Sequence, residues 1–209
     1  MFQLDTDLLL FINEHYTAFL DVFFWNISQR LTWVALYVAL AVCAFYRYGW
    51  RGLYVIGAVA LAVLLADQCS SALLKPWVAR PRPTHEPDLE GLLHIVNDYR
   101  GGMFGFPSSH AANTFAVALV YSLIWNNRRQ TLPLMLWVAL NCYSRMYLAV
   151  HYPLDILAGL LVGAVVAIVI YALVRKLDLP KQKADSSPWY IDYLPAIIIM
   201  LTIAACCFL

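Results

Sequence analysis

The chain has 209 residues, of which 62% are hydrophobic and 13% are charged. An average soluble domain carries about 25% charged residues, so this composition, with a mean hydropathy of +0.67, excludes an ordinary soluble protein and indicates an integral membrane protein. The net charge of +1 gives no support to nucleic-acid binding, and the length suits one domain over residues 1–209.

Residues 4–28 mix apolar side chains with acidic and amide side chains. The apolar positions roughly follow helical spacing, but the segment is too polar for a comfortable bilayer crossing. We expect one or two amphipathic helices that lie at the membrane interface.

Six apolar runs follow, each near the roughly 20 residues that a bilayer crossing requires. The expected spans cover residues 31–46, 52–74, 109–125, 131–148, 153–174 and 189–209. The sequence therefore predicts an all-α, polytopic membrane protein with six transmembrane helices and an N-terminal interfacial amphipathic helix. The five cysteines lie inside apolar runs without metal-binding spacing and are expected to be free thiols.

The one long polar connection runs from residue 75 to residue 107 and contains four prolines before residue 88 that should stop a regular helix. A connection of this length in a compact protein is often functional. Its basic residues include Lys75, Arg80, Arg82 and Arg100.

The distribution of basic residues predicts the orientation in the membrane. With six spans, the loops 47–51, 126–130 and 175–188 share one face, which the positive-inside bias places in the cytoplasm. This face carries Arg47, Arg51, Arg128, Arg129, Arg175, Lys176, Lys181 and Lys183. The polar groups of the 75–107 connection and of residues 145–152 then lie together near the opposite, periplasmic surface of a bacterial inner membrane.

A Gly- and Pro-rich turn leads into the apolar run after residue 110, so Ser108, Ser109 and His110 should lie at a helix N-terminus. Unpaired backbone N–H groups and the positive end of the helix dipole favour an anion such as phosphate there. Taken alone, these serines are more simply explained as N-cap residues, because Ser is common before a helix.

The remaining ionisable groups complete a phosphoryl-transfer site. Lys75, Arg82 and Arg145 could bind the phosphate oxygens, and His151 and Asp155 are four residues apart, so that a carboxylate could fix the imidazole tautomer. Either His alone, including His110, could be structural. The combination favours catalysis, because so many ionisable groups near a bilayer are costly unless they pair with something.

Three segments resemble the signature of the type 2 phosphatidic acid phosphatase family, the membrane relatives of vanadium haloperoxidases. They match the family's Lys-x6-Arg-Pro, Pro-Ser-Gly-His and Ser-Arg-x5-His-x3-Asp motifs in the family's order, across residues 75–155. The matching residues are Lys75 with Arg82-Pro83, Pro107-Ser108-Ser109-His110, and Ser144-Arg145 with His151 and Asp155. Ser109 departs from the motif glycine, which puts the local turn geometry in question. Arg80 forms a second Arg-Pro pair, but the spacing selects Arg82.

The resemblance implies a role for each motif residue. His151 would be the nucleophile, Asp155 its partner, and His110 the general acid and base, while Lys75, Arg82, Ser108 and Arg145 would bind the phosphate. Ser109, in place of the motif glycine, would add a hydroxyl next to the phosphate and is counted with the phosphate-binding residues. It also implies catalysis without a metal or other cofactor. Arg80 and Arg100, outside the motif spacing, are weaker candidates for a phosphate or headgroup contact.

These observations predict a lipid phosphate phosphatase that works through a phosphohistidine intermediate, with the lipid bilayer and a membrane lipid phosphate as its partners. Undecaprenyl diphosphate and lipid A are the preferred substrates, ahead of phosphatidylglycerophosphate and phosphatidic acid. The motifs contact phosphate alone, so they do not separate these lipids. A lipid phosphotransferase and a non-enzymatic phosphate-binding membrane protein remain open alternatives, as does the oligomeric state.

Overall fold

The computed structural model describes residues 3–176 and 188–208. Within these ranges the protein is all-helical, which confirms the predicted fold class, and its β-pairing is confined to an isolated bridge between Pro81 and Phe104. The longer helices are α1 (Gln3–Glu14), α2 (Ala18–Ser28), α3 (Val34–Tyr48), α4 (Gly52–Asp67), α6 (Ser109–Trp125), α7 (Arg128–Tyr147), α8 (Pro153–Lys176) and α9 (Trp189–Cys206). All five cysteines are free.

Short helical segments connect these elements. They are η1 (Leu31–Trp33), η2 (Gly49–Arg51), η3 (Gln68–Leu74), α5 (Lys75–Val78), η4 (Pro83–His85), η5 (Pro87–Leu89) and η6 (Val96–Asp98). The chain turns between α3 and α4 at Gly49, whose φ of 58° lies in the region that favours glycine.

The helix that begins with α4 runs further than the sequence predicted. It continues through the π-helical segment η3 into α5, so Lys75 lies on a helix and not in the polar connection. Pro76 does not stop it, because proline is tolerated in the first turn of a helical segment. The helix ends at Ala79, which is in the left-handed conformation.

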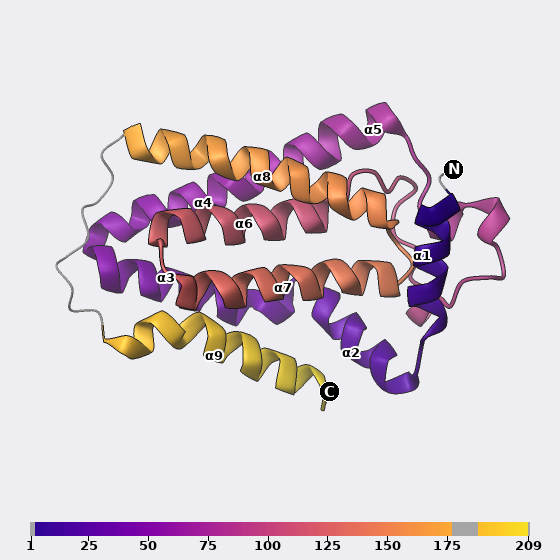
Figure 1. Ribbon diagram of the computed structural model, residues 1–209, viewed down its shortest axis with the longest axis horizontal. Coiled ribbons are helices and arrows are strands. Elements are labelled where there is room, and N and C mark those ends of the chain that lie inside the picture. The colour runs from indigo at the N-terminus through magenta and orange to yellow at the C-terminus, as the bar shows by residue number, and fades with distance from the viewer. Residues whose placement is uncertain (1–2, 177–187, 209) are drawn as a thin grey trace.

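The centre of the bundle is α6, which packs against α4, α7 and α8 (Figure 1). Gly159 and Gly163 of α8 face α6 so closely that an added Cβ would lie 2.4 Å from the Ser108 carbonyl oxygen and 2.5 Å from that of Ala112. This close approach brings the N-terminus of α6, which carries the second predicted motif, against the N-terminus of α8, where the third motif ends.

The N-terminal region forms two helices, within the range of one or two that was expected. Figure 1 shows α1 lying across the end of the bundle where α6 and α8 begin and α7 ends. It buries Asp5, Leu9 and Asn13 on one face, while Leu4 and Phe11 are 80% and 60% exposed. Two of its three buried side chains are thus polar, and its exposed side mixes apolar residues with the acidic residues Asp7 and Glu14.

Two helical stretches of the described residues, Leu31–Val78 and Pro153–Lys176, are long and apolar enough to cross a membrane. The first contains both α3 and α4. Large apolar side chains cover the outer face of α8, where Leu157 and Leu161 are 61% and 66% exposed. Such a surface suits lipid contact rather than water. The count of six spans stays a prediction.

Candidate active site

The structure brings the three motifs together at one end of the bundle. Lys75 comes from α5, Arg82 from the connection, Ser108 to His110 from the start of α6, Arg145 from the last turn of α7, and His151 and Asp155 from the entry to α8. Lys75, Arg82, Ser109, His110, Arg145 and His151 all line one cavity of about 880 Å³.

His151 is 1% exposed and lies between a cation and a carboxylate. Its Nε2 is 3.1 Å from Nη1 of Arg82, which can only donate, so Nε2 must accept. A neutral ring then carries its proton on Nδ1, which lies 3.5 Å from Oδ2 of Asp155 and has no hydrogen-bond partner. In this Nδ1–H tautomer, the lone pair of Nε2 points toward Arg82.

The surroundings of His151 keep its imidazole neutral. Burial, and then the positive charges of Arg82, Arg145 and Lys75, hold the pKa of His151 well below its ordinary value. A neutral imidazole is the form that can act as a nucleophile.

Asp155 is fully buried, and each of its carboxylate oxygens has a fixed partner. Oδ1 accepts a hydrogen bond of 2.9 Å from Nη1 of Arg80, and Oδ2 accepts one of 3.0 Å from the backbone N–H of Tyr152. Asp155 is thus the expected neighbour of His151, and Arg80 faces this carboxylate.

Two arginine side chains retain buried donors that no group in the described protein satisfies. Nη1 of Arg82 also donates to the Val150 carbonyl oxygen at 3.0 Å, and Nη1 of Arg145 donates to Ser28 Oγ at 2.9 Å. The Nε atoms of both arginines are buried without a partner. A buried unpaired donor is costly, so these groups are suited to an anionic ligand.

The motif serines have different surroundings. Ser108 is the N-cap of α6, and its Oγ accepts from the Ala111 N–H at 3.5 Å. Ser109, which replaces the motif glycine, contacts the ammonium group of Lys75 and lies 2.8 Å from Ser71 Oγ. The turn therefore accommodates Ser109, and its hydroxyl orients a cation beside the cavity.

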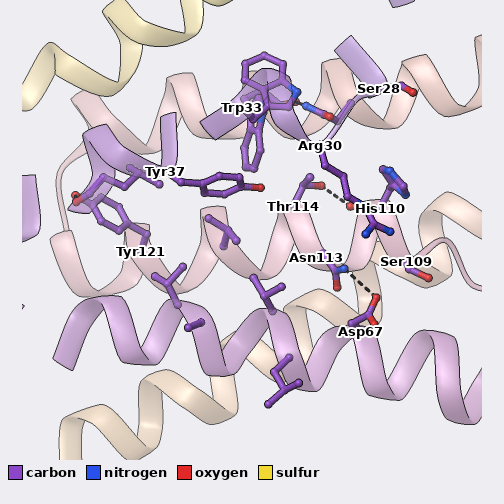
Figure 2. Close-up of a pocket in the computed structure, with 18 of the residues that line it drawn as sticks. Ser28, Arg30, Trp33, Tyr37, Asp67, Ser109, His110, Asn113, Thr114 and Tyr121 are labelled. Atoms are coloured by element: carbon purple, nitrogen blue, oxygen red, sulfur yellow. Dashed lines mark hydrogen bonds between the residues drawn. The ribbon is translucent and has the colours of Figure 1, made fainter. Parts of the chain in front are cut away.

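His110 lines the same cavity from the first turn of α6, and Figure 2 shows it beside Arg30. Its backbone carbonyl oxygen accepts a hydrogen bond of 2.8 Å from Thr114. On the α4 side, Asn113 donates to Oδ1 of Asp67 at 3.1 Å, a contact between helices also drawn in Figure 2.

Sequence reasoning missed several residues of this site. Arg30, Tyr99, Ser71 and Asn113 line the cavity, and the hydroxyl of Tyr99 accepts from Nη2 of Arg145 at 3.4 Å. For Arg30, the sequence feature that could have indicated a role in the site is its basic side chain between two apolar segments. The structure brings together no group of three or more His, Cys, Asp or Glu side chains fit for a metal among the residues it describes.

Away from this end the cavity is apolar. It continues between α3, α4, α6 and α7, where its walls are largely aliphatic and aromatic side chains (Figure 2). These walls include Tyr37, Leu40, Val59, Val63, Val117 and Trp137. The cavity thus joins a cationic end to a long apolar one.

Comparisons with known proteins identify the family of this chain. The model of the PAP2 superfamily matches residues 51–178, more than half of the chain. The lipid A 4'-phosphatase of Bacteroides thetaiotaomicron is 36% identical over 89% of this chain and 84% of its own length. That of Porphyromonas gingivalis is 39% identical over 81% of this chain and 72% of its own. The crystal structure of Aquifex aeolicus LpxE superimposes with a TM-score of 0.66 at 26% identity, covering 82% of this chain and 96% of that one. The chain therefore belongs to the PAP2 superfamily and is an enzyme of its lipid phosphatase class.

Proposed function

We propose that this protein hydrolyses the 4'-phosphate of lipid A through a phosphohistidine on His151, as a single membrane-embedded domain. The observation that carries the mechanism is the contact between Arg82 and His151, which turns an acceptor nitrogen toward a group of cations. The two lipid A 4'-phosphatases, similar over most of their length, support the choice of substrate.

In the first step, Nε2 of His151 attacks phosphorus, and the bond to the sugar oxygen breaks as His110 donates a proton to that oxygen. Arg82, Arg145 and Lys75, with the Ser109 hydroxyl and the N-terminus of α6, stabilise the equatorial oxygens. The ring of His151 becomes positively charged, and the carboxylate of Asp155 stabilises that charge through Nδ1–H.

In the second step, His110, now neutral, takes a proton from water as the water oxygen attacks phosphorus. The bond between phosphorus and Nε2 breaks, and inorganic phosphate leaves. His110 is again protonated and His151 is again neutral, so atoms and charges balance over one turnover. These steps use side chains and backbone N–H groups of the protein and are written without a metal.

The apolar part of the cavity supports a lipid substrate. Its aliphatic and aromatic walls would take an acyl chain, while the cationic end holds the phosphate. Undecaprenyl diphosphate also combines a phosphate with a long apolar chain, so it is the second candidate that the same experiment must test.

For the membrane arrangement we propose six spans, with the site near the periplasmic surface of the inner membrane and α1 at the interface. The turn η2, the start of α7 and the end of α8 lie at the end of the bundle away from α1 (Figure 1). Together with the last turn of α3, which adjoins η2, they carry the basic residues Arg47, Arg51, Arg128, Arg129, Arg175 and Lys176, which favours the cytoplasm for that end. Lys181 and Lys183 of the same predicted loop lie outside the described residues. External accessibility of a tag in the loop 175–188 would overturn this orientation.

The decisive experiment measures phosphate release by the purified protein in detergent with EDTA present. Lipid A, undecaprenyl diphosphate, phosphatidylglycerophosphate and phosphatidic acid are offered in parallel, and mass spectrometry locates the phosphate lost from lipid A. His151→Ala should abolish release. His85→Ala is the matched control, because His85 lies in η4, outside the cavity wall.

We expect release from the 4'-position of lipid A, unchanged by EDTA. Preferred release from undecaprenyl diphosphate would replace the substrate and keep the mechanism. Lipid products that gain a phosphate would identify a phosphotransferase. Equal turnover by His151→Ala and the wild type would overturn the mechanism, and binding without turnover would leave the phosphate-binding alternative.

A further inference from the structure

Arg80 lies just outside the motif spacing, yet the structure places it between two buried carboxylates. Its Nη1 donates to Oδ1 of Asp155 at 2.9 Å, and its Nη2 donates to Oδ2 of Asp5 at 2.6 Å. The side chains of Asp5 and Asp155 are 2% and 0% exposed. The guanidinium also lies over the ring of Tyr152, 4.0 Å from its centroid.

Asp5 ties the N-terminal helix to the entry of α8. While Oδ2 accepts from Arg80, Oδ1 accepts a hydrogen bond of 2.8 Å from the backbone N–H of Leu154. One oxygen of this α1 carboxylate thus contacts the segment that carries His151 and Asp155, and the other contacts Arg80, which itself holds Asp155. These two contacts explain why α1 turns the acidic side chain of Asp5 inward.

The effect on Asp155 is to fix its rotation. Arg80 holds Oδ1, the Tyr152 N–H holds Oδ2, and Oδ2 is also the oxygen 3.5 Å from Nδ1 of His151. On the third side, the backbone at Gly105 passes so close that an added Cβ would lie 2.8 Å from Oδ2. The carboxylate therefore presents one defined oxygen to the imidazole.

We propose that Arg80 and Asp5 are positioning residues, which act through Asp155 to hold the imidazole of His151 in its attacking orientation and tautomer. The inference rests on the proposed function, because it assumes that His151 attacks phosphorus. Among the described residues that line the cavity, Arg82 is present and Arg80 is not. Arg80 should therefore affect the attack on phosphorus and not the binding of the phosphate.

The prediction separates kcat from KM. Asp155 stabilises charge that develops on His151 as the bond to phosphorus forms, so a misplaced carboxylate raises the barrier without weakening substrate binding. Loss of a hydrogen-bond partner that orients a metal-ligating side chain typically costs about 10- to 100-fold, and we take the same range for a partner that orients a nucleophile. We expect Arg80→Gln to lower kcat by about that factor with KM unchanged, Arg80→Lys to recover part of the loss, and Asp5→Asn to lower kcat less than Arg80→Gln.

Asn13→Ala is the matched control for a general weakening of the packing of α1 against the bundle. Asn13 lies on the same buried face, but its amide donates to the carbonyl oxygens of His94 and Tyr147, at 2.9 Å and 2.8 Å, and not to the α8 entry. It should lower the melting temperature of the detergent-solubilised protein and leave kcat close to that of the wild type.

A second readout does not depend on turnover. The 15N spectrum of the histidine side chains, assigned for His151 by comparison with His151→Ala, should show the Nδ1–H tautomer in the wild type. It should shift in Arg80→Gln and stay unchanged in Asn13→Ala. If the wild type hydrolyses none of the lipids, the proposed function fails, while this spectrum still decides the positioning role.

Two results would overturn the inference. A raised KM with unchanged kcat in Arg80→Gln would make Arg80 a phosphate ligand. The second result is that Arg80→Gln and Asn13→Ala, at equal melting temperature, have the same kcat and the same His151 spectrum. The ion pairs of Arg80 with Asp5 and Asp155 would then be purely structural.

Discussion

Arg82 donates from Nη1 to Nε2 of His151 across 3.1 Å, and the two side chains are 9% and 1% exposed. The same arginine keeps a buried Nε without a partner. One side chain thus sets the tautomer of the proposed nucleophile and offers a donor to the phosphate that it would attack.

Replacing Arg82 by Lys should therefore impair catalysis even though the positive charge is kept. A lysine ammonium cannot hold the Val150 carbonyl oxygen, the imidazole and a phosphate oxygen with one planar fork. We expect Arg82→Lys to lower kcat/KM by about 100- to 1000-fold, as for loss of a preorganised donor to the transition state. Steady-state phosphate release measures this, and an effect as small as that of Arg100→Lys, in the same connection, would contradict it.

The lowered pKa of His151 predicts the acid limb of the pH profile. Burial and the neighbouring cations hold that pKa well below its ordinary value, so the neutral, attacking form persists as the pH falls through about 6.5, the usual histidine pKa. We therefore expect protonation of His151 to lower kcat/KM only at a pH well below that ordinary value. Ionisation of the substrate phosphate also affects kcat/KM. It is measured by 31P titration in the same micelles, and the pH profile is corrected for it. A remaining limb at the ordinary histidine value would show that His151 is not shielded in this way.

Much of the site could be predicted from the sequence, because its residues are fixed to helix ends. Ser109 and His110 begin α6, Arg145 ends α7, and Asp155 is in the first turn of α8. Once these apolar runs are aligned in one membrane, their ends share a depth. His110 and Arg145 then lie at one depth without any knowledge of the loops, whereas Arg82 and His151 lie in the segments between helices.

What could not be predicted depends on contacts between distant segments. Arg80 and Asp155 are 75 residues apart, as are Asp5 and Arg80, and no periodicity in either segment signals the pairing. The extension of the helix to Lys75 depends on the π-helical segment η3, which changes the register without a composition signal. Arg30 lines the cavity from the connection between α2 and η1, whose path depends on how these helices pack.

The close packing of α6 on α8 should make Gly159 sensitive to a single methyl group. An added Cβ would meet the backbone oxygen of Ser108 at 2.4 Å, and backbone cannot rotate away. We expect Gly159→Ala to destabilise the protein by about 1–3 kcal/mol and to lower activity, because Ser108 precedes Ser109 and His110.

Gly57→Ala is the matched control for that substitution. Gly57 also lies within a helix, α4, but a Cβ there meets nothing within 4 Å. Alanine should be neutral or slightly stabilising, since it is favoured over glycine in helices by up to about 1 kcal/mol. Thermal unfolding in one detergent measures both variants, and equal melting temperatures would show that α6 and α8 are not in such close contact.

Arg30 should strengthen phosphate binding from the side of His110. It lines the cavity, is exposed at its edge, and lies beside His110 in Figure 2. Since an exposed cation is partly screened by water and salt, we expect Arg30→Gln to raise the inhibition constant of inorganic phosphate by about tenfold or less, and the difference to shrink at high salt. Arg51→Gln, in η2, removes the same charge away from the cavity and should leave that constant unchanged. Equal constants for Arg30→Gln and the wild type at low salt would remove Arg30 from the phosphate site.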